Sequence, residues 1–316
     1  MDISGFRRTI RTHTVPVGQR TFLRCILSMI LCIALFFFTM QAVLADDPAS
    51  PVRSINHRGY NTVAPENTLP AYELSKENGF HIVETDIAFT KDGVPVLLHD
   101  AEINRTARNA DGSEPDRTIE IRQITYEEAL AYDFGIWKGE DYKGTKIPTF
   151  EEFLQLCRRL DLDPYIELKG NRGYSSKEVK GLVDLVRQYG LEKRATWISF
   201  DKPYLEAVSE CDPDARLGLL ILLWLSADNV EQSIQDVKTL QTGSNEVFLD
   251  VYCFCLNVVE GCAGLCRDAG IPLEAYFIGL DFEGELKKLD PYVSGATTNQ
   301  IRYDELVKES FSVSGS

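Results

Sequence analysis

Short apolar runs alternate with amphipathic stretches along most of the chain, from residue 53 to residue 309. Each run is followed by a stretch that carries apolar residues at helical spacing, a pattern that predicts a strand and then a helix. The eight predicted strands are 53–56, 81–89, 164–168, 195–199, 216–223, 247–252, 273–278 and 292–297. Strands separated by helices pair in parallel, so the pattern predicts an α/β fold closed into a (β/α)8 TIM barrel.

An irregular segment, 101–149, interrupts this alternation. A short strand at 94–98 precedes it, and one helix is predicted within it, at 126–132. We interpret the segment as a small insertion after the second strand. The remaining predicted helices are 68–78, which Gly79 ends, then 151–160, 176–189, 203–211, 229–240, 258–269, 283–289 and 302–309.

The second strand places two carboxylates, Glu84 and Asp86, two residues apart. Side chains at that spacing point to the same face of a strand. Buried carboxylates are costly unless they are paired or bind a metal, so a functional interpretation explains this strand better than packing does. Active sites of TIM barrels lie at the carboxyl ends of the strands. The other polar residues at such ends are His57, Arg58, His99, Glu167 and Lys169.

Glu84, Asp86 and Glu167 are the predicted metal ligands. Three hard oxygen donors suit Ca²⁺ or Mg²⁺ rather than zinc, so we expect one divalent cation. The alternative is that they are solvated acids on the rim of an acidic barrel.

The chain has only four histidines, and two of them, His57 and His99, flank the predicted acids. Imidazole transfers protons in both directions near neutral pH, so this pair is the predicted catalytic acid and base. His81 begins a strand and is interpreted as structural.

Arg58 and Lys169 are predicted to bind phosphate, because a guanidinium matches phosphate oxygens and an ammonium supplies a point charge. Lys169 has a structural alternative, an ion pair with Glu167. Aromatic residues at other strand ends are candidates for the wall of the substrate site, although such residues are more often core: Phe200, Trp224 and Tyr276.

Seven motifs follow one another in order: His57-Arg58-Gly59, Pro65-Glu66-Asn67-Thr68, Glu84-Thr85-Asp86, Leu98-His99-Asp100, Asn104-Arg105-Thr106, Ile147-Pro148-Thr149-Phe150-Glu151-Glu152 and Ile166-Glu167-Leu168-Lys169. This set resembles the glycerophosphodiester phosphodiesterase family from about residue 52 to residue 170. The resemblance implies a metal-dependent enzyme that hydrolyses a glycerophosphodiester to sn-glycerol 3-phosphate and an alcohol. The last third departs from the family pattern at 275–278 and at 293–299, which puts in doubt the wall that recognises the alcohol group.

Two other functions fit the same fold. A phospholipase of the C or D type, acting on intact phospholipid, needs an apolar rim, for which the insertion offers Phe134, Ile136 and Trp137. A catalytically inactive binding barrel is the third possibility, but such a barrel has no need of both histidines and all three acids.

The formal net charge is −15 at pH 7. Such a surface repels nucleic acid and anionic membranes, so the expected partner is a small-molecule substrate. It also repels a phosphate diester, and a cation at the site is needed to reverse the local field.

Residues 1–45 have the pattern of a signal peptide or membrane anchor: a basic stretch, an apolar run at 25–45, and Val43-Leu44-Ala45 before Asp46. The apolar run is about as long as a membrane span, which is the rival interpretation. In either case we expect residues 46–316, the predicted barrel domain, to be exported to the periplasm, the cell surface or the medium. Membrane contact is expected only through an uncleaved anchor.

Six cysteines follow the targeting segment, an even number that permits disulfides in an exported protein. The four between Cys253 and Cys266 have poor spacing for a zinc site.

Overall fold

The computed structural model describes residues 53–222, 227–252, 256–276, 289 and 292–305. The predicted targeting segment, Trp224 and the predicted helix at 283–289, apart from Leu289, lie outside these ranges. Among the described residues, no helix is long and apolar enough to cross a membrane.

Eight parallel strands form a closed barrel, which confirms the predicted fold. Their bounds are β1 Arg53–Asn56, β2 Ile82–Phe89, β4 Asp163–Leu168, β5 Thr196–Ser199, β6 Arg216–Ile221, β7 Val247–Tyr252, β8 Leu273–Tyr276 and β9 Gly295–Thr298. Each strand pairs with its neighbours in the order of the chain, and β1 pairs with both β2 and β9 to close the ring. A ninth strand, β3 (Pro95–Leu97), pairs antiparallel with β2.

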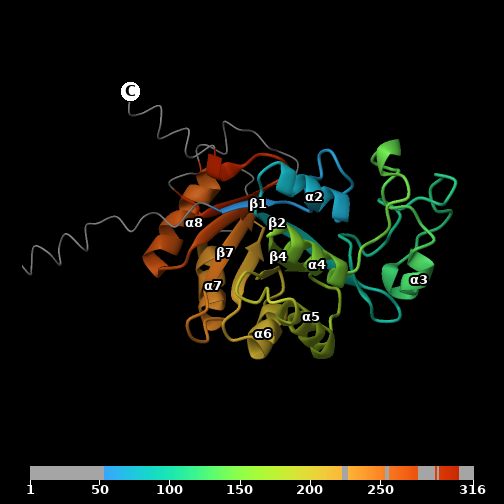
Figure 1. The fold of residues 1–316 in the computed structure, drawn as a ribbon. Coiled ribbons are helices and arrows are strands. Elements are labelled where there is room, and N and C mark those ends of the chain that lie inside the picture. Colours follow the sequence, from blue (N-terminus) through green and yellow to red (C-terminus); the bar gives the residue numbers. More distant parts are fainter. Residues whose placement is uncertain (1–52, 223–226, 253–255, 277–288, 290–291, 306–316) are drawn as a thin grey trace, which may run out of the picture. The chain divides into compact units, whose positions relative to one another are not determined.

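Helices lie against the outside of the barrel (Figure 1). Their bounds are α2 Leu69–Glu77, α4 Phe150–Leu160, α5 Ser176–Gln188, α6 Lys202–Cys211, α7 Ala227–Thr239 and α8 Leu256–Ala269. Reciprocal capping boxes fix where two of them begin: Thr149 with Glu152 starts α4, and Ser175 with Glu178 starts α5. Of the predicted last helix, 302–309, residues 302–305 are described, and 303–305 of these are helical.

Alternation along each strand sorts side chains into two layers. In β7, Leu249 and Val251 face the apolar layer under the helices, whereas Phe248 and Asp250 face the lumen. Gly218 in β6 makes room for the lumen ring of Phe248, because a Cβ there would lie 2.2 Å from its Cζ. The lumen is therefore a packed core, and only its upper layers are free for chemistry.

The insertion at 101–149 has its own apolar cluster, which includes Ile103, Ile121, Phe134 and Ile147. It lies beside α4 in Figure 1 and carries a short helix, α3 (Tyr126–Ala129), and 3-10 turns at Ile121–Gln123 and Glu140–Tyr142. The helix is shorter than the predicted 126–132. The chain turns at Asp133, whose carboxylate accepts the backbone N–H groups of residues 135, 136 and 144.

The described cysteines are free thiols: Cys157, Cys211, Cys262 and Cys266.

Candidate functional site

A strained turn after β1 brings the first histidine and arginine to the mouth of the barrel. Arg58 has φ +55° and Gly59 has φ +77°. A Cβ on Gly59 would lie 2.7 Å from the Cβ of Ala71, so only glycine fits. The turn aims the backbone N–H of Arg58 at Oε2 of Glu84, 2.8 Å away.

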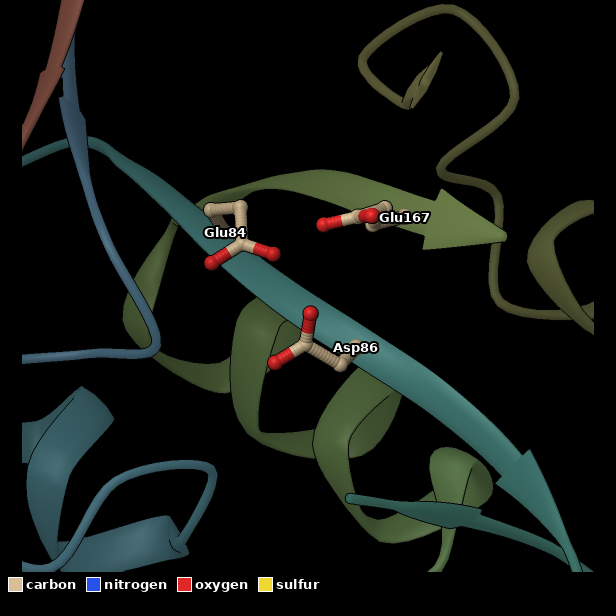
Figure 2. A group of neighbouring side chains, drawn as sticks. All are labelled: Glu84, Asp86 and Glu167. Carbon is tan, nitrogen blue, oxygen red and sulfur yellow. The ribbon is translucent and has the colours of Figure 1, made fainter. Parts of the chain in front are cut away.

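Glu84 and Asp86 of β2 and Glu167 of β4 converge as the strand spacing predicts (Figure 2). A ligand oxygen of each lies within 4.8 Å of the others, and all three side chains are buried. One oxygen of each carboxylate lacks a hydrogen-bond partner: Glu84 Oε1, Asp86 Oδ1 and Glu167 Oε1. A cation is the natural partner for three such oxygens, because buried charges need pairing or coordination. The residues therefore fit a hard divalent metal ion.

Two basic side chains offset part of this charge. Lys169 Nζ lies 2.7 Å from Glu167 Oε2 and 2.9 Å from Asp86 Oδ1, although the second contact is an ion pair without hydrogen-bond geometry. Arg58 Nε lies 3.2 Å from Asp86 Oδ2, and its Nη1 donates to Glu66 Oε1 at 2.9 Å. The structural alternative for Lys169, an ion pair with Glu167, is thus present in the structure, and both cations still line the cavity.

Burial and neighbouring charges shift the pKa values of the three acids in different directions. Burial, and then the negative charges of Asp86 and Glu167, raises the pKa of Glu84 well above its ordinary value. Burial also raises the pKa of Glu167. Burial would raise the pKa of Asp86 as well, but Lys169 and Arg58 hold it well below its usual range. A carboxylate cluster of this kind is stabilised by adding positive charge.

His57 is held by two asparagines that fix its tautomer. Asn61 Nδ2 donates to the backbone carbonyl of His57 at 2.6 Å and to Asn299 Oδ1 at 2.9 Å. The Asn299 oxygen is therefore an acceptor, so the His57 Nδ1, 3.0 Å away, carries the proton. Burial, and then Arg58, lowers the pKa of His57 from 6.5 to about 3. The neutral ring then offers the lone pair of Nε2 as a proton acceptor.

His99 is held by a carboxylate instead. Its Nδ1 lies 2.6 Å from Asp100 Oδ1, and the other oxygen of Asp100 accepts from Arg105 Nε at 2.6 Å. Arg105 also makes a bidentate pair with Glu66, at 2.7 and 2.8 Å. Since Glu66 binds Arg58, one chain of ion pairs connects the ring of His99 to the carboxylate cluster.

A cavity of about 110 Å³ opens above these groups. Its polar side is lined by His57, Arg58, Glu84, His99, Glu167 and Lys169, and its other side by Ile198, Phe200, Leu220, Leu222, Asp250, Tyr276 and Thr297. All the predicted site residues except Asp86, which is buried beneath, therefore line one cavity. Phe200 and Tyr276 lie in the predicted wall. Phe134 of the insertion packs in its own cluster and does not line this cavity.

Sequence reasoning missed four residues of this site. Glu66, Asp100 and Arg105 belong to the sequence motifs but had no role assigned to them. Their ion pairs with one another and with Arg58 hold them at the site. Asp250 was missed altogether, because it is a single acid in its strand, whereas β2 was singled out by two acids on one face.

Known proteins resemble this chain in sequence and fold. The sequence model of the "Glycerophosphoryl diester phosphodiesterase family" matches residues 57–248. A glycerophosphodiester phosphodiesterase of Caldanaerobacter subterraneus subsp. tengcongensis is 35% identical over 167 residues, 52% of this chain and 65% of that protein. Glycerophosphodiester phosphodiesterase 1 of Mus musculus is 34% identical over 173 residues, 52% of this chain and 50% of that protein. These alignments thus cover less than two thirds of either relative.

Other similarities extend further along the chain. A glycerophosphodiester phosphodiesterase of Bacillus subtilis is 26% identical over 307 residues, 91% of this chain and 99% of that protein. A solved structure from Silicibacter pomeroyi has a TM-score of 0.69 at 23% identity, covering 83% of this chain and 95% of its own. A phosphodiesterase of Oleispira antarctica, solved with the product sn-glycerol-3-phosphate, has a TM-score of 0.65 at 23% identity, covering 81% and 95%. These structures support the barrel fold.

Proposed function

Because the chain belongs to the glycerophosphoryl diester phosphodiesterase family, we propose that it hydrolyses glycerophosphodiesters to sn-glycerol 3-phosphate and an alcohol with the help of one divalent cation. The observation that carries the proposal is the buried cluster of Glu84, Asp86 and Glu167, each with one oxygen that has no hydrogen-bond partner, beside a cavity lined by two histidines.

The three carboxylates would hold the cation. Their ligand atoms are all oxygens, which favours Ca²⁺ or Mg²⁺. The bound ion supplies electrostatic stabilisation of the charge that develops on the phosphoryl oxygens.

Arg58 and Lys169 would bind the same phosphate from the side of the cavity. Both line it, and each is fixed by carboxylates, so little reorganisation is needed when the substrate arrives. Preorganised cations of this kind stabilise the transition state more than they stabilise a freely solvated ground state.

The histidines would carry out the two proton transfers. His57 has its Nδ1–H bound to Asn299, so its Nε2 would accept the proton of the attacking hydroxyl. His99, whose Nδ1 is fixed by Asp100, would then donate a proton to the leaving alkoxide. In each histidine the transfer takes place at Nε2 and leaves the hydrogen bond of Nδ1 intact, so both rings keep their orientation.

The test measures release of glycerol 3-phosphate from a panel of glycerophosphodiesters, before and after exhaustive chelation. Glu84→Gln and Glu167→Gln are expected to lose activity at limiting cation, and Glu73→Gln, which changes an exposed acid in an ion pair with Arg159, serves as the matched control. Full activity in the chelated enzyme would overturn the metal requirement.

A second candidate substrate is an intact phospholipid or another diester with an apolar tail. Phe200 and Leu222 are exposed at 36% and 44%, and both line the cavity, which favours an apolar group at this side. The same panel should therefore include phospholipids and lysophospholipids; turnover of phospholipid alone would make this the correct class.

A further inference from the structure

A second cluster of ionisable groups lies in the lumen, outside the proposed catalytic group. The hydroxyl of Tyr165 lies 2.9 Å from Asp250 Oδ2 and 2.8 Å from Glu274 Oε2. Glu274 also pairs through Oε1 with Arg216 Nη2 at 2.9 Å and with Arg53 Nε at 3.5 Å. Tyr165, Asp250 and Glu274 are buried, and Asp250 is the member of the cluster that lines the cavity.

The number of protons in this cluster indicates that one of its two acids is neutral. A tyrosine hydroxyl has one proton and cannot donate to two carboxylates at once. Both short contacts are hydrogen bonds only if one of the two carboxyls carries a proton and donates it to Tyr165. Glu274 pairs with two guanidinium groups, which favours Asp250 as the carboxyl that donates through Oδ2, with Tyr165 donating in turn to Glu274. Consistent with this, burial and the charge of Glu274 raise the pKa of Asp250 well above its ordinary value.

The other oxygen of this neutral acid lacks a partner. Asp250 Oδ1 is buried and has no hydrogen bond, and the side chain is 1% exposed. Around it the cavity wall is formed by Ile198, Leu220 and Tyr276. A buried acceptor without a donor destabilises a protein, so a ligand that supplies the donor gains affinity and orientation there.

We propose that Asp250 is a specificity residue that accepts a hydrogen bond, at Oδ1, from a hydroxyl group of the substrate. The inference rests on the proposed function, because it assigns the glycerol hydroxyls to the wall opposite the metal-binding acids. A neutral acid favours a hydroxyl donor over a cationic head group, which would instead require a charged carboxylate.

The test uses two variants of the full chain. Asp250→Asn keeps an acceptor oxygen and replaces the acid proton by an amide N–H toward Tyr165, so it mimics the neutral acid. Asp250→Leu removes the acceptor. For a glycerophosphodiester, we expect Asp250→Leu to raise KM about 5- to 20-fold, the loss of one hydrogen bond, and Asp250→Asn to stay near wild type. Bis(p-nitrophenyl) phosphate has no hydroxyl, so the loss caused by Asp250→Leu should be several-fold smaller on it than on the glycerophosphodiester.

The outcomes separate the inference from the proposed function. Equal losses on both substrates in Asp250→Leu would mean that Asp250 only supports the fold, and a loss in Asp250→Asn as large as in Asp250→Leu would mean that a charged carboxylate is required; either result overturns the proposal.

A binding assay tests the inference even if no diester is cleaved and the proposed function fails. The thermal stabilisation by glycerol 3-phosphate is then compared with that by propyl phosphate, which lacks the hydroxyls. Wild type and Asp250→Asn should prefer glycerol 3-phosphate, and Asp250→Leu should show no preference. A preference that survives in Asp250→Leu would overturn the inference.

Discussion

Replacing Lys169 with methionine tests whether the folded protein needs a positive charge beside the carboxylate cluster for its stability. Methionine keeps an unbranched side chain, one atom shorter, but removes an ammonium that lies 2.7 Å from Glu167 and 2.9 Å from Asp86. Removing one partner of a buried ion pair costs about 3–5 kcal/mol, because the other charge remains buried. A barrel of this size loses about 2 °C in Tm per kcal/mol, so the Tm of the metal-free variant should fall by roughly 6–10 °C.

The same substitution should increase the effect of a divalent cation. Without Lys169, the oxygens of Asp86 and Glu167 lose their nearest positive charge, and a bound ion is the only replacement within the cluster. We therefore expect millimolar Ca²⁺ or Mg²⁺ to raise the Tm of Lys169→Met more than that of wild type, since a ligand that binds the folded state stabilises it in proportion to its affinity. Activity should remain low even when the ion is bound, because the phosphate contact is gone.

Thermal unfolding in chelator and in excess cation measures both effects. Lys180→Met is the matched control, because Lys180 makes an exposed ion pair with Asp184 one helical turn away. Exposed pairs contribute about 0–1 kcal/mol, so this control should change the Tm by about 2 °C at most. If the two variants lose the same stability in chelator, or if the cation stabilises Lys169→Met no more than wild type, the cluster does not need a cation.

Three further predictions concern the histidines, pH and processing. His57→Ala and His99→Ala should each lower kcat on a glycerophosphodiester by about 10²–10⁴, and on a nitrophenyl diester only His99→Ala should recover, because nitrophenolate leaves without a proton. The raised pKa values of Glu84 and Glu167 contribute stability that is present below their ordinary value of 4.5 and is lost as the pH rises through the folded values. The Tm of the metal-free protein should therefore fall as the pH rises above 4.5, and saturating cation should abolish that fall; a Tm that rises over this window would contradict the assigned shifts. Terminal sequencing of the exported protein should find a mature chain that begins near Asp46, whereas an intact N-terminus in the membrane fraction would support the anchor.

The barrel and most of the candidate site could be predicted because both follow from strand alternation. Glu84 and Asp86 share a face since side chains in a strand alternate, and that face is the lumen once the other face is buried under helices. His57 and Glu167 meet them because all parallel strands of a barrel end at one rim. No contact between distant residues was needed for these predictions.

The contacts that orient the candidate catalytic groups depend on how the barrel closes. His57 and Asn299 are 242 residues apart, and they meet because β1 pairs with β9 in one register, Asn56 opposite Thr298. The sequence shows a departure from the family pattern at this point, but it does not show which histidine the asparagine contacts. Asp250 is similar, since its partner Tyr165 lies 85 residues away across the lumen.

Charge balance in the site explains how so acidic a protein would bind the proposed anionic substrate. Five carboxylates form the cluster and its ion-pair chain, which are Glu66, Glu84, Asp86, Asp100 and Glu167. They face three paired cations, Arg58, Arg105 and Lys169. Counted over these carboxylates, arginines and the lysine, without the histidines, the deficit is two positive charges, the charge of one divalent cation. Without it, the pKa of Glu84 is raised and the site repels phosphate; with it, the field of the site is balanced and the two fixed cations in the cavity are available to the diester. A monovalent cation leaves the deficit half filled, so on charge alone the site should select a divalent ion.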